Sequence, residues 1–276
     1  MPRLWTAALW MPCGQKNSMT RLAGARILPW CLPLFLLAAW WGAAALEAVP
    51  GWLLPSPVEV ARTVYVYVVG IGDGPYGGRF RHDAVASLAR VGCGYALAVV
   101  PGLVLGLWSG RSVTVARLLS FTVNGVKSVP GISWLPLALI WLGVGFMTTV
   151  SLIALAGFFP VYFSAAAAAA SVPQDLLNAG RMLGCSRITL FTRVILPWAM
   201  PQVCAGLRVA LGMSFAYLVL GELTGVPDGL GALIMDARMN GRVDILLTGI
   251  VLIAALGSVC DALLVRVLRR LPGAAR

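Results

Sequence analysis

Long apolar segments separated by short polar ones dominate this sequence and predict a bundle of membrane-spanning helices. A helix needs about 20 predominantly apolar residues to cross a bilayer. Six segments meet or approach that length, at about residues 27–46, 84–107, 129–144, 150–170, 200–223 and 245–268. Pro130 and Pro136 interrupt the third segment, which a membrane tolerates only where neighbouring helices or a cavity satisfy the freed carbonyl groups. We therefore predict an all-α membrane protein with about six transmembrane helices.

The residues between the first two spans are amphipathic and rich in turn formers. The run Leu54-Pro55-Ser56-Pro57 predicts the start of a helix over residues 58–69, which we expect along the outer membrane interface, and residues 70–78 predict a loop. Residues 1–26 hold four basic residues and no acid. Although residues 4–10 are apolar, no convincing small-residue cleavage site follows them. We therefore expect a cytoplasmic tail and not a signal peptide.

A polar interruption between Ser171 and Gln202 divides the apolar part of the chain. No Asp, Glu, Lys or Arg lies between Lys127 and Asp175, whereas one acid and three arginines follow within about twenty residues. Ser171 is expected to cap a short helix whose first turn holds Asp175, because Ser accepts backbone N–H groups and acids suit that end. Gly184 is expected to end this helix in the left-handed conformation.

A second short helix is expected directly after Gly184. Ile188, Phe191, Val194 and Ile195 would form its apolar face, and Leu196-Pro197 would terminate it. In the first helix, Leu176, Leu177 and Gly180 fall on or near one face. The two helices together predict a helix-turn-helix on the membrane surface that offers apolar side chains to another molecule.

Basic residues are unevenly distributed between the two sides of the predicted bundle. With the amino terminus inside and six crossings, the inner segments hold fourteen Lys and Arg residues against one acid, Asp175. The outer segments hold six basic residues against seven acids. Because basic residues in short loops stay on the cytoplasmic side, both termini, an inner loop over residues 109–127 and the helix-turn-helix are predicted to be cytoplasmic.

Composition excludes several other classes of protein. With 59% hydrophobic and 11% charged residues, the chain is too apolar for a soluble domain of 276 residues. The net charge of +11 follows from the basic inner segments, and no compact basic motif with interleaved aromatics indicates nucleic-acid binding. Six cysteines are scattered without a CxxC pair, and the one histidine, His82, is expected to be a solvated surface residue. We expect no catalytic residue, no metal and no cofactor.

The polar interruption resembles the cytoplasmic coupling loop of ABC importer permeases. That loop carries a small-residue triplet, three residues, Gly, nine residues, and then an aliphatic residue, any residue and Leu-Pro. Here the triplet is Asn178-Ala179-Gly180, the glycine is Gly184, and the end is Val194-Ile195-Leu196-Pro197. Asn178 stands where the family commonly has Glu, and Gly180 replaces an alanine. The resemblance implies that Asp175, Asn178, Ala179, Gly180, Gly184, Leu196 and Pro197 couple the chain to an ATPase.

Shorter pieces in the same order resemble the nitrate, sulfonate and taurine branch of these permeases. They include the Leu54–Pro57 run and the segments Ser87–Val91, Leu135–Gly143, Gly206–Arg208, Gly221–Leu223 and Gly229–Gly231. The resemblance implies the fold of type I (MetI-like) importer permeases. It divides the chain into a tail (1–26), a first helix with an outer interfacial helix (27–83), a core permease domain (84–268) with the coupling loop at 171–199, and a second tail (269–276).

The resemblance also implies the binding partners and the cellular location of the protein. We expect a second copy of the chain, two ABC ATP-binding subunits inside, a periplasmic or lipid-anchored substrate-binding protein outside, and the lipid bilayer. The chain would be a multi-pass protein of the bacterial cytoplasmic (inner) membrane, and its cargo a small anion such as nitrate, a sulfonate or taurine. No GxxxxGK[ST] loop is present, so ATP hydrolysis is expected in a separate subunit and this chain is not expected to be an enzyme.

Four charged side chains lie within the predicted spans and are candidates for function by default. Arg208 and Glu222 are candidates for the substrate path. Arg208 could equally pair within the chain, and Glu222 is expected more in a structural hydrogen bond than against substrate. Arg90 is expected to extend to the lipid headgroups, with a place on the permeation path as the alternative, and Asp261 is expected to pair with a basic neighbour.

Two other classes of protein remain as alternatives. An ion-coupled secondary transporter or channel would need no ATPase, but the spans show no evident inverted repeat and few acids for proton coupling. An intramembrane enzyme is disfavoured because the sequence shows no paired acids, metal ligands or activated nucleophile within the spans.

Overall fold

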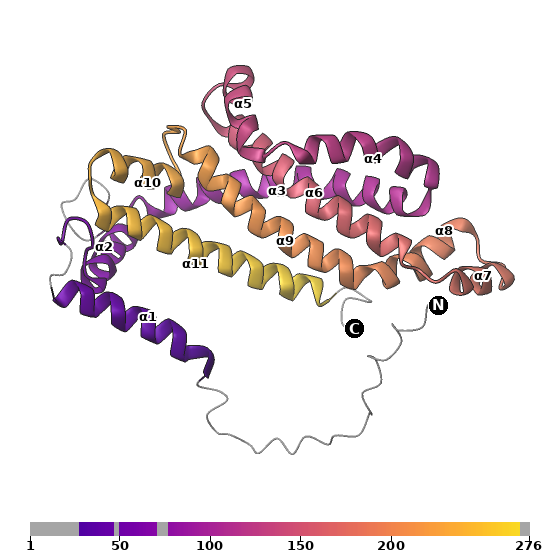
Figure 1. Ribbon diagram of the computed structural model, residues 1–276, viewed down its shortest axis with the longest axis horizontal. Coiled ribbons are helices and arrows are strands. Elements are labelled where there is room, and N and C mark those ends of the chain that lie inside the picture. The colour runs from indigo at the N-terminus through magenta and orange to yellow at the C-terminus, as the bar shows by residue number, and fades with distance from the viewer. Residues whose placement is uncertain (1–27, 47–49, 71–76, 271–276) are drawn as a thin grey trace, which may run out of the picture. The chain divides into compact units, whose positions relative to one another are not determined.

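The computed structural model describes residues 28–46, 50–70 and 77–270, and all regular structure within these ranges is helical (Figure 1). The predicted tail at 1–26 and residues 271–276 lie outside them. The chain divides into two compact units, one up to Pro50 and one from Gly51 onward. The first unit contributes helix α1 (Leu28–Ala45), which occupies most of the predicted first span and contains Pro33.

The second unit contains all the other helices. They are α2 (Pro57–Val69), α3 (Phe80–Arg111), α4 (Val113–Ser128), a 3₁₀-helix (Gly131–Trp134), α5 (Leu135–Leu142), α6 (Phe146–Ala170), α7 (Gln174–Met182), α8 (Arg187–Leu190), a π-helical turn (Phe191–Ile195), α9 (Leu196–Glu222), α10 (Leu230–Met239) and α11 (Val243–Leu268). Ser56 caps α2 by accepting a hydrogen bond from the Glu59 N–H, so the helix predicted over residues 58–69 is confirmed, and its position along the outer interface stays a prediction.

Four of these helical stretches are long and apolar enough to cross a membrane. They are Phe80–Arg111, Phe146–Ala170, Arg187–Glu222 and Val243–Leu268. A fifth crossing results if α4 and the helical stretch Gly131–Leu142 count as one broken span, and the apolar part of α1, Cys31–Ala45, is shorter than a full crossing. The all-helical membrane class is therefore confirmed, and the predicted number of six fits only roughly.

The predicted inner loop at 109–127 and the simple third span at 129–144 are both wrong. Residues 113–128 form helix α4, whose first turn is capped by Ser112, and this helix meets the stretch Gly131–Leu142 at a bend of 87°. Helix α5 has only eight residues, or about 12 Å of length, so it does not cross a bilayer on its own. Pro130 stands at the break, where its missing N–H and fixed φ interrupt the helix.

Small residues bring α3 and α6 into close contact along their length. The α3 glycines Gly94, Gly102, Gly106 and Gly110 recur at intervals of four or eight residues and face α6. A Cβ added at Gly106 would meet Ala165 Cβ at 2.8 Å, and one at Gly110 would meet Ala169 Cβ at 2.8 Å. Both alanines are buried and belong to the six-alanine run of α6. The alanine run therefore packs against α3, because small facing residues allow helix backbones to approach.

Helix α9 packs on the other side of α6, and α2 and α10 close one end of the unit. Val161, Ala165 and Ala168 of α6 share a buried cluster with Ala199, Val203, Leu207 and Ala210 of α9. Tyr67 of α2 shares another with residues of α10 and α11. Figure 1 shows α10 at one end of this bundle and α7 and α8 at the opposite end. The two ends of the bundle are therefore built from different helices, α2 and α10 at one end and α7 and α8 at the other.

The α3–α6 contact predicts opposite outcomes for two glycines of one helix. Gly94→Ala should destabilise the protein by about 1–3 kcal/mol, since the new methyl group overpacks a filled core. Its Cβ would stand 2.6 Å from Ile153 Cβ and Cγ2. The matched change Gly92→Ala, where no atom lies within 4 Å, should leave the thermal unfolding midpoint in detergent unchanged or slightly raised. Equal midpoints for the two variants would contradict the packing.

Candidate functional site

The polar interruption forms the predicted pair of short helices, α7 and α8. Helix α7 ends in a Schellman motif, in which the Cys185 N–H donates to the Gly180 carbonyl at 3.1 Å and the Gly184 N–H donates to the Arg181 carbonyl at 3.0 Å. Gly184 has φ +75°, the left-handed conformation that favours glycine. The predicted helix end at Gly184 is therefore confirmed.

The predicted cap at Ser171 is wrong. Helix α7 starts two residues later, with Pro173 at its cap position, and the Ser171 hydroxyl donates instead to the Ala168 carbonyl at the end of α6. A serine beside two helices can satisfy either one, and here it binds the free carbonyl of the preceding helix. The second helix does begin with a serine cap, because Ser186 Oγ accepts a hydrogen bond from the Thr189 N–H.

Leu196-Pro197 does not terminate the second helix, which corrects the sequence prediction. The stretch from Arg187 to Glu222 is one continuous helical span that changes to a π-helical turn over Phe191–Ile195. Pro197 lies in the first turn of α9. A wider turn just before it accommodates the proline ring without breaking the helix. Helices α7 and α8 with the turn between them (residues 174–190) are called the coupling segment below. This segment is thus joined directly to α9, without a loop.

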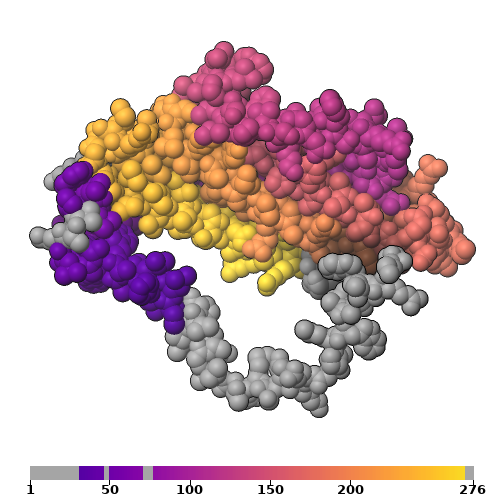
Figure 2. Space-filling model, in the orientation of Figure 1, coloured from indigo at the N-terminus to yellow at the C-terminus, as the bar shows by residue number. Residues whose placement is uncertain are grey.

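Several apolar side chains of the coupling segment are exposed. Met182 is 89% exposed, Leu183 is 83% exposed and Ile188 is 78% exposed, whereas Leu177 and Leu190 are buried in a small local core. Figure 2 shows this segment at one extremity of the larger unit. Large exposed apolar side chains on a turn that has its own core are typical of a surface that docks on another protein.

The predicted coupling residues occupy both faces of α7 and the start of α9. Asp175, Asn178 and Ala179 are exposed, and Asn178 Oδ1 accepts a hydrogen bond from the Arg181 guanidinium at 3.4 Å. Gly180 is buried, and a Cβ there would meet Leu190 Cδ1 at 2.5 Å. An alanine at this position would therefore require the end of the Leu190 side chain to shift. Leu196 and Pro197 are half-buried.

A buried ion cluster occupies the opposite end of the bundle. Arg90 of α3 is 4% exposed and its Nη1 lies 2.7 Å from Glu222 Oε1 of α9, while its Nη2 binds the Asp228 carboxylate. The expected extension of Arg90 to the headgroups is therefore wrong. A short path to a fully buried carboxylate satisfies the guanidinium better than lipid headgroups would. Arg90 Nε is buried with no hydrogen-bond partner among the residues that the structure describes.

Glu222 is held by the amino-terminal end of α10 as well as by Arg90. The Gly231 N–H donates to Glu222 Oε2 at 2.7 Å, and the Ser87 hydroxyl donates to the same carboxylate at 2.8 Å. Helix amino termini bind carboxylates because their first N–H groups lack partners within the helix. A Cβ at Gly229 would stand 2.5 Å from Glu222 Oε1, so this turn fits directly over the carboxylate. The structure thus places Glu222 in a hydrogen-bonded cluster.

Asp83 and Tyr67 extend the cluster toward α2. The Tyr67 hydroxyl donates to Asp83 Oδ2 at 2.6 Å, and the Gly229 N–H donates to Asp83 Oδ1 at 3.1 Å. Burial of Tyr67, and its hydrogen bond to Asp83, raise the pKa of this phenol well above its usual range. Tyr67 therefore stays a neutral donor at physiological pH. His82 is a surface residue, as predicted, with a side chain that is 72% exposed.

Arg208 pairs with Asp261 across α9 and α11. Its Nε lies 2.9 Å from Asp261 Oδ1 and its Nη2 lies 2.8 Å from Asp261 Oδ2, the bidentate geometry that guanidinium and carboxylate favour. The expected partner for Asp261 is thus confirmed. The pair is partly exposed on this chain. Of the two alternatives for Arg208, pairing within the chain is the one that the structure contains.

Comparison with known proteins identifies the family. The sequence model described as "Binding-protein-dependent transport system inner membrane component" matches residues 102–272. The taurine transport system permease protein TauC of Escherichia coli (strain K12) is 34% identical over 239 residues, which cover 86% of this chain and 85% of that protein. This chain belongs to that family of transport permeases.

Further relatives agree with the branch that the sequence motifs indicate. The nitrate import permease protein NrtB of Leptolyngbya laminosa is 29% identical to this permease over 75% of each chain. Together with taurine and aliphatic sulfonate permeases, it confirms the resemblance to the nitrate, sulfonate and taurine branch. Inward-facing structures of the MetNI methionine ABC transporter share the fold, with a TM-score of 0.59 and 18% identity, covering 69% of the permease and 94% of that chain.

The sequence motifs marked the members of the ion cluster without revealing that they meet. Ser87 and Arg90, Glu222, and Gly229 to Gly231 are separate pieces of the family resemblance, and the structure brings them within hydrogen-bond distance of one another. Asp83 and Asp228 were not singled out. Their positions in the sequence could have indicated both residues. Asp83 lies four residues before Ser87 and Asp228 directly precedes Gly229, and both are on the predicted outer side.

The cluster makes Arg90 more important for stability than a surface arginine of the same permease. Arg90→Met should lower the free energy of unfolding by about 3–5 kcal/mol, because it leaves the Glu222 carboxylate buried without its cation. Adding Glu222→Gln should recover part of that loss. The control Arg79→Met, which removes a half-exposed arginine 3.6 Å from Asp83, should cost about 0–1 kcal/mol. Thermal unfolding of the three purified variants in detergent checks the order, and a double variant that is less stable than Arg90→Met alone would contradict the pairing.

Proposed function

We propose that this permease is the membrane-spanning subunit of an ATP-driven importer for a small anion. The observation that carries the proposal is the coupling segment, an exposed apolar turn joined without a break to α9. An ATP-binding subunit that grips α7 and α8 would move α9 directly. Family membership supports this role, and the names of the relatives supply the cargo class of taurine, sulfonates or nitrate.

The proposed orientation follows from charge. Arg181, Arg187 and Arg193 surround the coupling segment, and the acids Asp83, Asp228 and Asp236 gather at the other end of the bundle. Because basic residues stay on the cytoplasmic side, the coupling segment and both termini would be cytoplasmic, in the cytoplasmic membrane of a bacterium. The end with α2 and α10 would face the external binding protein. Residues 1–26 and 269–276 would be cytoplasmic tails flanking the regions 27–83 and 84–268.

The proposed assembly contains two copies of the permease and two ATP-binding subunits. ATP binding closes the two ATP-binding subunits and draws the coupling segments together, which turns the bundle from inward-facing to outward-facing. The binding protein then releases its anion into the path, and hydrolysis with release of phosphate resets the inward-facing state. The permease supplies the path and the coupling surface, while nucleotide chemistry takes place in the partner.

Gly184 provides a test of the coupling. Gly184→Val forces a β-branched residue into the left-handed conformation at a cost of roughly 1–2 kcal/mol, which should reduce productive docking about tenfold. In proteoliposomes that contain the permease, its ATP-binding subunit and its binding protein, ATP hydrolysis should persist while taurine or nitrate uptake falls by about that factor.

Gly241→Val is the matched control, because Gly241 also has a positive φ and open space around it but lies between α10 and α11. It should keep normal coupling. Normal uptake by Gly184→Val would contradict the proposed coupling, and uptake that continues without any ATP-binding subunit would favour a secondary transporter or channel.

Cysteine labelling tests the orientation. In a background without native cysteines, Leu183→Cys should react with a membrane-impermeant maleimide only after the cells are opened. Met239→Cys, at the opposite end and 75% exposed, should react in intact spheroplasts. The reverse pattern would overturn both the topology and the proposed contact with an ATPase.

A further inference from the structure

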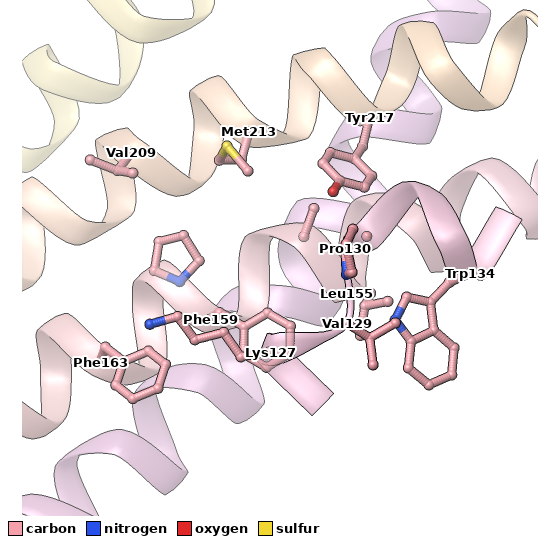
Figure 3. A pocket seen from close by; sticks show the side chains of 13 residues that line it. Lys127, Val129, Pro130, Trp134, Leu155, Phe159, Phe163, Val209, Met213 and Tyr217 are labelled. Atoms are coloured by element: carbon pink, nitrogen blue, oxygen red, sulfur yellow. The ribbon is translucent and has the colours of Figure 1, made fainter. Parts of the chain in front are cut away.

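A cavity of about 440 Å³ lies between the broken span and the middle of α6 and α9 (Figure 3). Its walls are mostly apolar and aromatic, and its main lining side chains are Lys127, Trp134, Phe159, Phe163, Met213 and Tyr217. Phe159 lies near the midpoint of α6 and Met213 lies in the second half of α9, several turns from the coupling segment. The cavity therefore lies well inside the part of the bundle that crosses the membrane.

Among the described residues that line this cavity, Lys127 is the only charged one. It stands in the last turn of α4, and its Nζ lies 4.3 Å from the centroid of the Phe163 ring. No acid lies within ion-pair distance of Lys127 in the described ranges 28–46, 50–70 and 77–270. Lys127 is exposed on this chain, and it lies in a helix that forms one half of the broken span, which makes it a functional candidate.

Comparison with the two intramembrane arginines singles out Lys127. Arg90 is neutralised by Glu222 and Asp228, and Arg208 is neutralised by Asp261. Lys127 has only an aromatic face beside it, and a ring holds a cation far more weakly than a carboxylate does. An anion that entered the cavity could therefore draw the ammonium group away from Phe163 without breaking an ion pair.

The polar atoms of the aromatic walls add donors on the same cavity. Trp134 carries an indole N–H and Tyr217 a phenol O–H, both able to donate to an oxygen of an acid group. Tyr217 lies against Gly131, where a Cβ would collide with its ring. This tight contact fixes the ring at the edge of the cavity. The remaining walls, among them Phe159, Leu155 and Met213, match a short carbon chain better than a hydrated inorganic ion.

We propose that this cavity is a transit site for an organic anion, with Lys127 binding its acid group and the apolar walls contacting its carbon chain. The proposal rests on the proposed import function and narrows it to short-chain sulfonates and carboxylates in preference to nitrate. It assigns the selectivity contribution of the permease to the broken span, whose first part, α4, the sequence alone predicts as an inner loop.

Charge removal at Lys127 is the first test, with taurine, ethanesulfonate and nitrate as probes in proteoliposomes of the full transporter. Lys127→Met should lower the maximal rate of ATP-dependent ethanesulfonate uptake at least about tenfold, since a charge-assisted contact is lost. Lys127→Arg should keep most of that rate. ATP hydrolysis stimulated by the binding protein should be retained by both variants. The control Arg117→Gln removes an exposed cation of the same helix away from the cavity and should leave uptake unchanged.

Chemical rescue separates a binding role from a structural one. In a cysteine-free background, Lys127→Cys should regain uptake after reaction with aminoethyl methanethiosulfonate, which restores an ammonium group, and should stay inactive after reaction with the sulfonatoethyl reagent. Ethanesulfonate present during the reaction should slow the modification.

The outcomes distinguish the two proposals. A wild-type transporter that imports none of the three probes with ATP would count against the proposed function. A wild-type transporter that imports them, together with normal uptake by Lys127→Met or no difference between the two reagents, would overturn the transit site alone. Nitrate uptake that depends on Lys127 as strongly as ethanesulfonate uptake would overturn the preference for organic acids.

Discussion

A charged side chain that is buried inside the protein needs a counter-charge beside it, and this constraint organises the end of the bundle that holds α10. Arg90 of α3, Glu222 of α9 and Asp228 before α10 satisfy one another, and the amino-terminal N–H groups of α10 complete the shell around the carboxylates. Three segments far apart in the sequence are thereby fixed at one point. The glycines at 229 and 231 belong to the same construction, because any side chain there would occupy the space of Glu222.

A different kind of contact holds the rest of the helices. Along α3 and α6, glycines and alanines let the backbones approach, so that dispersion contacts replace the hydrophobic drive that lipid cannot supply. Such seams are tight but carry few directional bonds. The polar cluster fixes the geometry at one end, and the small-residue contact holds α3 against α6 along their length.

The sequence predicted the elements that depend on local chemistry and missed those that depend on contacts between distant residues. Hydropathy located the long spans, and turn and cap residues located the start of α2 and the helix end at Gly184, since each is decided within a few residues. The sequence predicted an inner loop over residues 109–127, because three basic residues and several hydroxyls there hide helix α4, in which Val123 is the one buried residue. The sequence predicted that Arg90 extends to the lipid headgroups, because a partner 132 positions away leaves no local signal. It also predicted a helix end at Pro197, because a π-helical turn leaves no local signal either.

Helix α9 carries both the end of the coupling segment and one wall of the cavity. From Arg187 to Tyr217 the backbone is helical without a loop, a rod of about 45 Å at 1.5 Å per residue. A rod of this length turns a tilt of a few degrees at one end into a shift of several ångströms at the other. If binding of the ATP-binding subunits changes the affinity of the cavity for a solute, the solute changes the affinity for those subunits by the same factor. A solute wedged against Met213 and Tyr217 would hold the cytoplasmic end of the rod in place, so cargo in transit could set the pace at which the ATP-binding subunits cycle.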